Sequence, residues 1–201
     1  MKVSPRRSKT TGRHESFADR RARRAAIEDP TVVLDAGLRF LEARPRSIAE
    51  VQRRLASAGY REDLVAGAIE RLVALGVLDD EAFATQWVES RDRARPRGER
   101  ALQRELWLKG IGGATIDRVL SERRPGPDAE GQDGTEANAP SADEVAARRV
   151  IERSSAALAR VVDPRSRRQK AYAILIRKGF ASELAGVVAR EHVETAASED
   201  D

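Results

Sequence analysis

Residues 46–69 read RSIAEVQRRLASAGYREDLVAGAI, and residues 97–120 read RGERALQRELWLKGIGGATIDRVL, so the two stretches align at an offset of 51 positions. A third copy, RRQKAYAILIRKGFASELAGVVA at residues 167–189, aligns with the second at an offset of 69. The 18 additional positions are close to the length of a Pro- and Gly-rich acidic segment that separates the second copy from the third. Such self-similarity predicts several copies of one structural unit arranged in tandem.

Each copy contains the same helix-ending pattern, a Leu followed four positions later by Gly and then by an apolar residue. The Leu and apolar partners pair as Leu55/Tyr60, Leu106/Ile111 and Leu175/Phe180, and a further instance comprises Leu72, Gly76 and Val77. This spacing is typical of the Schellman motif, in which a left-handed Gly follows the helix and the two apolar residues touch. We therefore predict helix ends at Gly59, Gly76, Gly110 and Gly179.

The apolar residues recur with helical periodicity within the copies and in the segments before them, at residues 32–43, 80–93 and 143–160. Pro30 suits a first helical turn, and Ser47 and Asp79 or Asp80 suit N-caps. No segment sustains the alternation of apolar and polar residues that is typical of a strand. The predicted fold is all-α, with tandem repeats of three-helix modules in an elongated, curved array.

Charge divides the chain into segments. The 201 residues include 37 Lys and Arg and 33 Asp and Glu, for a net charge of +4. The predicted segments are a disordered basic arm (1–28), module 1 (29–76), module 2 (77–123), a flexible acidic Pro/Gly linker (124–142), a basic module 3 (143–193) and an acidic tail (194–201). Residues 143–193 carry eleven bases and six acids, so we expect an anionic partner for module 3.

Composition excludes several classes of function. The chain has no Cys, which rules out disulfides, thiolate metal sites and thiol catalysis, and no apolar run is long enough to span a membrane. We expect a cytoplasmic protein without cofactors. The two histidines, His14 and His192, have no neighbouring catalytic motif. The acidic run at residues 79–81 could begin a Mg²⁺-dependent nuclease site, but capping of the following helix explains it better.

Basic residues recur at the same places in all three modules, before the second helix and on its polar side. Such a series could follow a nucleic-acid backbone or an acidic groove on a protein; the alternative is a solvated face with intrahelical ion pairs. Trp87 and Trp107 could stack on bases, but their spacing favours core positions, more clearly for Trp87. The candidate binding residues are Arg46, Arg53, Arg54, Arg97, Arg100, Arg104, Arg165, Arg167, Arg168, Lys170, Arg177 and Lys178.

Residues 36–190 resemble the RecX family of bacterial regulatory proteins. The resemblance is strongest over residues 72–110. It rests on the pattern Leu-x-x-x-Gly-x-Leu-x-Asp-x-x-Phe-Ala, followed by an Arg, a Gly and the second helix ending, at Leu72, Gly76, Leu78, Asp80, Phe83, Ala84, Arg91, Gly98, Leu106 and Gly110. The long acidic linker and the basic arm depart from the family pattern.

The resemblance implies a non-enzymatic protein that binds the filament of RecA recombinase on DNA and suppresses its ATPase, strand-exchange and coprotease activities, in the setting of recombination, DNA repair and the SOS response. It implies RecA as partner, together with single- or double-stranded DNA bound without sequence specificity. We expect a monomer with no membrane association. The alternative is an autonomous DNA-binding architectural or regulatory protein whose helix pairs act as helix-turn-helix units.

Overall fold

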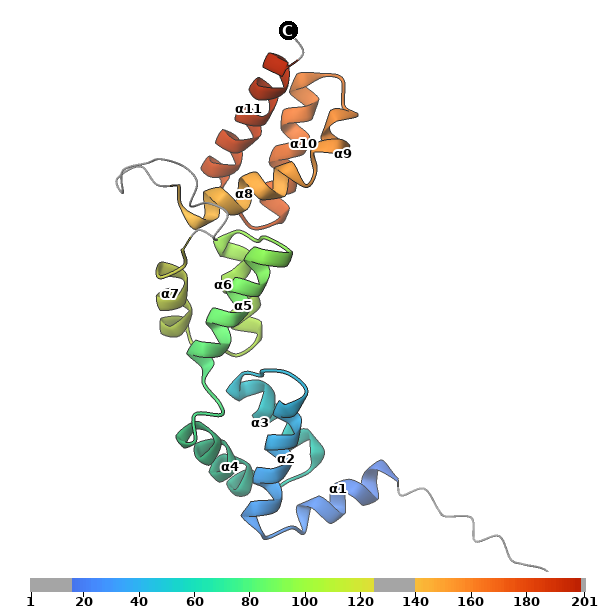
Figure 1. Cartoon of the computed structure of the whole chain (residues 1–201). Coiled ribbons are helices and arrows are strands. Elements are labelled where there is room, and N and C mark those ends of the chain that lie inside the picture. Colours follow the sequence, from blue (N-terminus) through green and yellow to red (C-terminus); the bar gives the residue numbers. More distant parts are fainter. Residues whose placement is uncertain (1–15, 125–139, 200–201) are drawn as a thin grey trace, which may run out of the picture. The chain divides into compact units, whose positions relative to one another are not determined.

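The computed structural model describes residues 16–124 and 140–199, with side chains up to residue 195. Those residues form eleven helices and no strand (Figure 1), which confirms the predicted all-α class. None of the described helices is both long enough and apolar enough to cross a bilayer. The chain divides into two compact units, the first comprising residues up to Arg44 together with Val51–Val77, and the second comprising Pro45–Glu50 and the residues from Leu78 onward.

The first unit contains module 1. Its helices are α1 (Phe17–Ala25), α2 (Pro30–Glu42), α3 (Ile48–Ala58) and α4 (Glu62–Ala74), with the first turn of α3 assigned to the second unit. Its core is formed by small and branched apolar side chains that α2, α3 and α4 bury at helical spacing, among them Val33, Val51, Leu55, Val65 and Leu72.

The second unit contains modules 2 and 3. Module 2 comprises α5 (Asp80–Ala94), α6 (Glu99–Leu108) and α7 (Gly113–Ser121), and module 3 comprises α8 (Ala142–Glu152), α9 (Ser155–Ala159), α10 (Pro164–Arg177) and α11 (Ser182–Glu199). Each module encloses its own cluster of buried side chains, centred on Leu102 and Leu106 in module 2 and on Leu175 and Phe180 in module 3. Small separate cores of this kind explain how the chain folds with so few aromatic residues.

The predicted helix endings are confirmed. The four described residues with positive φ are Gly59, Gly76, Gly110 and Gly179. The N–H groups of Val77, Ile111 and Phe180 donate to the carbonyls of Leu72, Leu106 and Leu175 at 2.9–3.2 Å, which is the long-range bond of the Schellman motif.

The predicted helix starts are also confirmed. Pro30 opens α2 behind an Asp29 cap, and the Asp79 carboxylate accepts from two backbone N–H groups in the first turn of α5. Ser47 is fully buried; its hydroxyl accepts from the N–H of Glu50 and donates to the carbonyl of Lys109 at 2.6 Å. Ser47 thus caps α3 and also fixes residues 45–50 against the end of α6.

The prediction of a disordered arm over residues 1–28 is wrong for residues 17–25, which form α1; residues 1–15 lie outside the described part of the chain. Ser16 and Asp19 form a capping box at the start of α1. Arg24 then donates to the carbonyl of Ala58 at 3.3 Å and lies 5.7 Å from the centre of the Tyr60 ring. Capping and contacts of α1 with the end of α3, made by Arg24 and by Arg21 against Gly59, therefore order a segment whose composition alone favours disorder.

Two predicted boundaries in module 3 also require correction. The expected helix over residues 143–160 is broken into α8 and α9, because the Ser154 hydroxyl bonds back to the carbonyl of Val150 and the chain turns to bury Leu158. The predicted end of module 3 at residue 193 falls inside a helix, since α11 continues to Glu199.

A buried ion-pair network joins module 2 to module 3. The Arg123 side chain is only 5% exposed and bonds to the carboxylates of Asp92 and Asp143 at 2.5–2.9 Å and to the carbonyl of Arg97. Asp143 also accepts from the N–H of Glu99 at the start of α6. Residues 125–139 of the predicted linker lie outside the described residues. The described residues on either side of them, Arg123 and Asp143, are held together by this network.

Candidate functional site

The acidic run at residues 79–81 has a structural role. Asp79 caps α5, Asp80 accepts from the N–H of Ile48 at 2.9 Å, and Glu81 forms an ion pair with Arg118 at 2.6 Å. Burial, and secondarily the charge of Asp79, raises the pKa of Asp80, against the lowering effect of the Ile48 N–H. The described residues contain no group of three or more His, Asp and Glu side chains arranged to hold a metal ion. The capping interpretation is therefore confirmed for Asp79, whereas Asp80 and Glu81 bind other partners.

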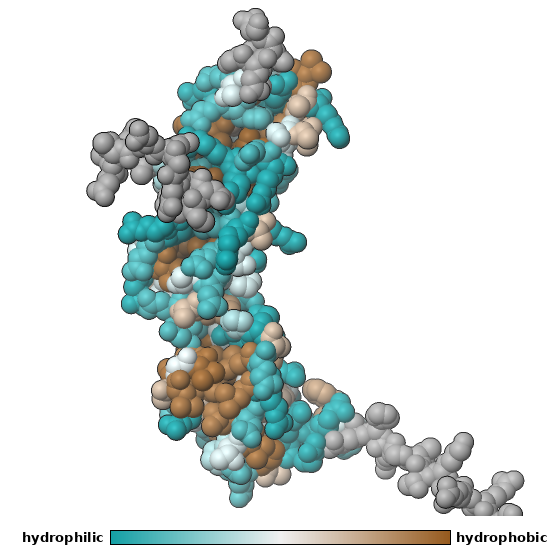
Figure 2. All heavy atoms as spheres, viewed as in Figure 1, coloured by the Kyte–Doolittle hydropathy of each residue, from teal (hydrophilic) through white to brown (hydrophobic). Residues whose placement is uncertain are grey.

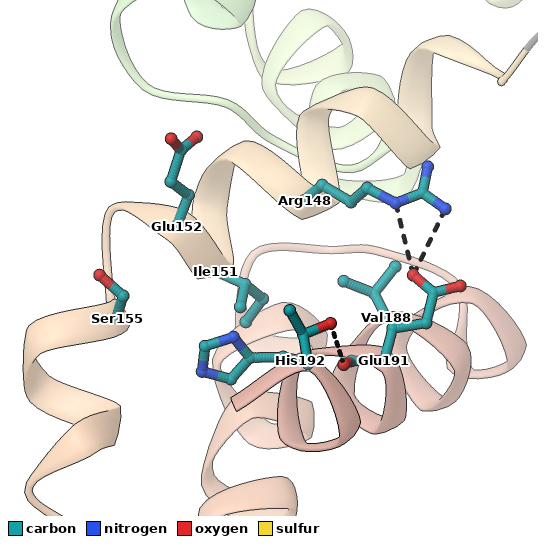
Figure 3. Close-up of a pocket in the computed structure, with 8 residues that line it drawn as sticks. Arg148, Ile151, Glu152, Ser155, Val188, Glu191 and His192 are labelled. Atoms are coloured by element: carbon teal, nitrogen blue, oxygen red, sulfur yellow. Dashed lines mark hydrogen bonds and ion pairs between the residues drawn. The ribbon is translucent and has the colours of Figure 1, made fainter. Parts of the chain in front are cut away.

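His192 lines a pocket of about 380 Å³ in module 3 (Figure 3). Ile151 and Val188 contribute apolar surface, and Arg148 is ion-paired with Glu144 and Glu191. Burial, followed by the charge of Arg167, lowers the pKa of His192, so the imidazole is neutral at physiological pH. Arg148, the only cation drawn beside His192, is thus already paired with carboxylates, which makes this pocket a weaker candidate for anion binding than the basic surfaces.

In the first unit and the turn before α3, the predicted basic residues lie on the surface or at its edge. Arg53 and Arg54 are exposed on α3, with Arg54 positioned 5.6 Å from the centre of the Phe40 ring, and Arg46 is half-buried. Hydrophobic surface gathers over α4 (Figure 2), at and just beyond which Val73 and Leu75 are exposed. The basic face of module 1 thus belongs to α3 and not to α4.

In module 2 the structure separates the three predicted residues. Arg97 is half-buried and ion-paired with Glu105 at 3.5 Å. Arg100 and Arg104 are exposed on α6 and form no hydrogen bond or ion pair with any residue of the described chain. Sequence spacing alone did not distinguish the paired cation from the two unpaired ones.

In module 3 the predicted residues lie along α10 but differ in their contacts. Arg165, Arg168 and Arg177 are exposed. Arg167 donates to the carbonyl of Val161 at 3.0 Å and Lys170 to that of Ala157 at 3.1 Å. These two side chains hold the loop that precedes α10, in addition to any binding role.

Cations from the ends of three helices converge where module 2 meets module 3. Lys178 follows α10, and its carbonyl accepts from the N–H of Gly98 at 3.0 Å. Arg153, at the end of α8, donates to the carbonyls of Arg93 and Ala94 at 2.9–3.2 Å, where α5 ends. Burial lowers the pKa of Lys178, and the charges of Arg97, Arg153 and Arg95 lower it further.

We call Arg95, Arg97, Arg153 and Lys178 the junction cluster. The charged groups that lower the pKa of Lys178 are all cations, so like-charge repulsion opposes this arrangement in the absence of an anion. Sequence reasoning selected Arg97 and Lys178 but missed Arg95 and Arg153, because no local pattern brings the ends of α5 and α8 together.

The two tryptophans have different environments. Trp87 stacks on Phe83 with ring centres 5.9 Å apart, and its indole N–H donates to Glu105. The cations of Arg91 and Lys109 lie 4.2 and 4.8 Å from the centre of the Trp87 ring. Trp107, on the same helix as Arg100 and Arg104, is 69% exposed. The core interpretation is confirmed for Trp87 and wrong for Trp107, which lies outside the buried stripe of α6.

The chain matches known proteins in its first two modules. Residues 34–72 match the first three-helix domain of RecX, and residues 79–120 match the second three-helix domain. The protein named "Regulatory protein RecX" of Mycolicibacterium vanbaalenii is 45% identical over 84 residues, which is 42% of this chain and 46% of that protein. Its counterpart in Mycobacterium avium is 44% identical over 84 residues, 42% of this chain and 49% of that protein. The matched segment therefore spans about half the length of these relatives.

Two solved structures share the fold over a longer part of the chain. The crystal structure of RecX from Lactobacillus salivarius aligns with a TM-score of 0.66 and 19% identity, covering 82% of this chain and 97% of that one. Another, a crystal structure of regulatory protein RecX, aligns with a TM-score of 0.62 and 20% identity, covering 86% and 72%. At these identities the likeness establishes the fold alone, which extends the tandem helical arrangement beyond the two matched domains. The two RecX three-helix domains, matched in order, and the relatives named RecX support the RecX family for this chain.

Proposed function

We propose that this chain binds the filament of RecA recombinase on DNA and inhibits the ATPase, strand-exchange and coprotease activities of RecA, without catalysing a reaction itself. The observation that carries the proposal is the match of residues 34–72 and 79–120 to the two RecX three-helix domains. A filament repeats the same binding groove, and several weak contacts made by linked modules add up to useful affinity.

The contacts are assigned to the twelve basic residues predicted from the sequence, acting from a monomeric protein in the cytoplasm. Support comes from the exposure of Arg54, Arg100, Arg104 and Arg168, which leaves their charges available to an acidic or phosphate-bearing partner. Contacts to DNA would be to the backbone, because Asn and Gln, which read adenine, are scarce among these cations.

The alternative, sequence-specific DNA binding through helix-turn-helix units, receives less support. In such units the second helix of each pair enters the major groove, a position that would fall to α4 in module 1 and α7 in module 2. Helix α4 carries three acids and one base and borders the exposed hydrophobic surface of Figure 2, and α7 carries one of each. Neither helix has the positive charge that a recognition helix needs.

Strand exchange in the presence of purified full-length protein tests the proposal. We expect inhibition at protein concentrations well below that of RecA, and weaker inhibition by the double variant Arg165→Glu/Arg168→Glu with helical content retained. The matched control is Arg39→Glu/Arg71→Glu, two exposed positions in module 1 that give the same change in net charge. Unchanged strand exchange with the native protein would refute the function, and equal loss in both variants would refute the assignment of the surface. DNA binding without RecA, with a marked sequence preference, would favour the alternative.

A further inference from the structure

Helix α6 presents two kinds of binding group on one face. Arg100, Arg104 and Trp107 are spaced by four and three residues, so they follow one another along the helix surface. The opposite face is buried through Ala101, Leu102 and Leu106. The exposed face therefore combines cations with an aromatic ring and has no role in the core.

Trp107 is among the most exposed large hydrophobic side chains of the described residues. The side chain is 69% exposed, whereas Trp87, the other tryptophan, is half-buried in the network described above. A large aromatic ring left in water is a cost that a binding partner removes, and tryptophan is prominent among residues that dominate binding energy.

Trp107 lines a groove between α6 and α7 of about 420 Å³, within the range of roughly 300–1,000 Å³ that is usual for ligand pockets. Ile116 is buried at 4% exposure and forms an apolar floor, and a side chain at Gly112 or Gly113 would meet no atom within 4 Å. The full lining comprises Arg100, Gln103, Arg104, Trp107, Gly113, Ile116 and Asp117. The groove thus has open space beside an exposed ring.

The charges of the groove favour an anion. Arg100 and Arg104 have no carboxylate partner among the described residues, and the single acid of the lining is Asp117. Gln103 donates to Glu99 at 3.2 Å, which leaves its amide oxygen free to accept a hydrogen bond. The lining therefore offers two positive charges against one negative charge, next to an amide acceptor.

We propose that this groove of module 2 binds single-stranded nucleic acid, with a base stacked on Trp107 and the neighbouring phosphates held by Arg100 and Arg104. An acidic peptide would use the two cations and leave the ring exposed, and an apolar protein segment would leave the cations unpaired. A single strand uses all three side chains, whereas a duplex keeps its bases inside and away from the ring. The inference deepens the proposed function by giving DNA a contact site of its own, but its test requires no RecA.

Intrinsic fluorescence tests the stacking directly. The variant Trp87→Phe keeps a ring against Phe83 and leaves Trp107 as the only tryptophan. Titration with a short oligothymidylate is expected to quench its emission, a matched oligouridylate to do the same, and a duplex of equal length to quench little. No quenching at saturating oligothymidylate would overturn the proposal, as would equal quenching by the duplex. Quenching by RecA alone and not by the oligonucleotide would identify the groove as a protein contact and also overturn it.

Binding of a labelled oligonucleotide to the otherwise native chain gives a second readout that does not depend on Trp87→Phe. We expect Trp107→Ala to weaken affinity roughly 5- to 150-fold, the range for loss of one stacked base. Leu108→Ala, the adjacent side chain at 62% exposure and outside the groove, is the matched control and should leave affinity unchanged.

The charged residues of the groove are tested by the salt dependence of the same binding. Arg100→Gln/Arg104→Gln should make the fall of log affinity with log salt shallower, by about 1.4 in slope. Asp117→Asn should tighten binding, because it removes the negative charge of the lining. Equal affinities for Trp107→Ala and Leu108→Ala would overturn the proposal. If the native protein binds the oligonucleotide but does not inhibit RecA, the proposed function is wrong and the inference about the groove still stands.

Discussion

Arg123 shows how much of the second unit depends on one residue. Its guanidinium is almost fully enclosed by the carboxylates of Asp92 and Asp143, whose side chains are each 19% exposed. Burial lowers the pKa of Arg123, but the hydrogen bonds and charge of Asp92, followed by those of Asp143, outweigh burial and raise the pKa overall. The cation is thus retained because its two partners are buried with it.

Replacing Arg123 should therefore lower the free energy of unfolding far more than replacing its exposed neighbour Arg124. Arg123→Ala leaves two enclosed carboxylates without a counter-ion, and the expected loss in free energy of unfolding is about 3–5 kcal/mol. Arg124→Ala, at an exposed position, should stay within about 0.5 kcal/mol of the native chain. Urea denaturation followed by circular dichroism measures both, and equal losses would show that the network contributes little.

Asp80 offers a test that depends on pH. Because burial raises the pKa of Asp80 in the folded state, the folded protein holds this proton more tightly than the unfolded chain does, and stability falls as pH rises from the unfolded pKa of about 3.9 through the raised value. Asp80→Asn keeps an oxygen acceptor for the Ile48 N–H and removes the titration. The variant should therefore gain thermal stability relative to the native chain across this window, then keep a constant advantage at higher pH. Parallel melting curves from pH 3.5 to 7 would contradict the assignment.

At the scale of helices, the junction cluster places repulsion where α5, α8 and α10 end. Lys178→Gln should raise the melting temperature at low salt, because it removes a cation whose described charged neighbours are cations. Arg177→Gln, on the same helix end but exposed, loses only a favourable interaction with the helix dipole and should leave the melting temperature unchanged or slightly lower.

Salt and phosphate separate this explanation from a simple packing effect. At about 1 M salt, where the screening length is about 3 Å, the part of the advantage of Lys178→Gln that comes from the charges of Arg95, Arg97 and Arg153 should disappear, while the part that comes from burial of the Lys178 cation should remain. If the junction cluster binds an anion, adding phosphate at constant ionic strength should raise the melting temperature of the native chain more than that of the Lys178→Gln variant. An advantage that persists unchanged in high salt would show that charge repulsion is not its cause.

Most helices could be predicted because their signals are local. The Leu-to-Gly spacing located four helix ends, and Ser47, Asp79 and Pro30 marked helix starts where the structure has them. Helix α1 was missed because it is ordered by contacts of Arg21 and Arg24 with the end of α3, and the break after α8 because it depends on burying Leu158. These are contacts across the fold, which no local periodicity encodes.

The candidate site was predicted less completely than the fold. The sequence indicated which basic residues lie on polar helix faces, and Arg53, Arg100 and Arg104 are exposed as expected. It did not indicate that Arg97 pairs with Glu105, or that Arg95 and Arg153 approach Lys178, since those groups come from different helices. Repeated spacing fixes the face of a helix, while tertiary packing decides which charges on that face are already neutralised.

At the scale of the whole molecule, the acidic linker separates modules 2 and 3 in sequence but not in structure. Both belong to one compact unit, and Arg123 and Asp143 join the described residues on either side of the linker. The basic third module, the junction cluster and the α6 face consequently lie on one unit. A single compact unit thus carries most of the proposed contacts to RecA and DNA.

The rate of ATP hydrolysis by preformed RecA filaments on single-stranded DNA tests the central claim most directly. On adding the purified full-length protein, we predict a progressive fall in hydrolysis that saturates below one molecule per RecA subunit, and a smaller fall with Arg165→Glu/Arg168→Glu. A hydrolysis rate that stays unchanged up to equimolar protein, with the protein shown to be folded by its helical circular dichroism, would contradict a role in regulating RecA.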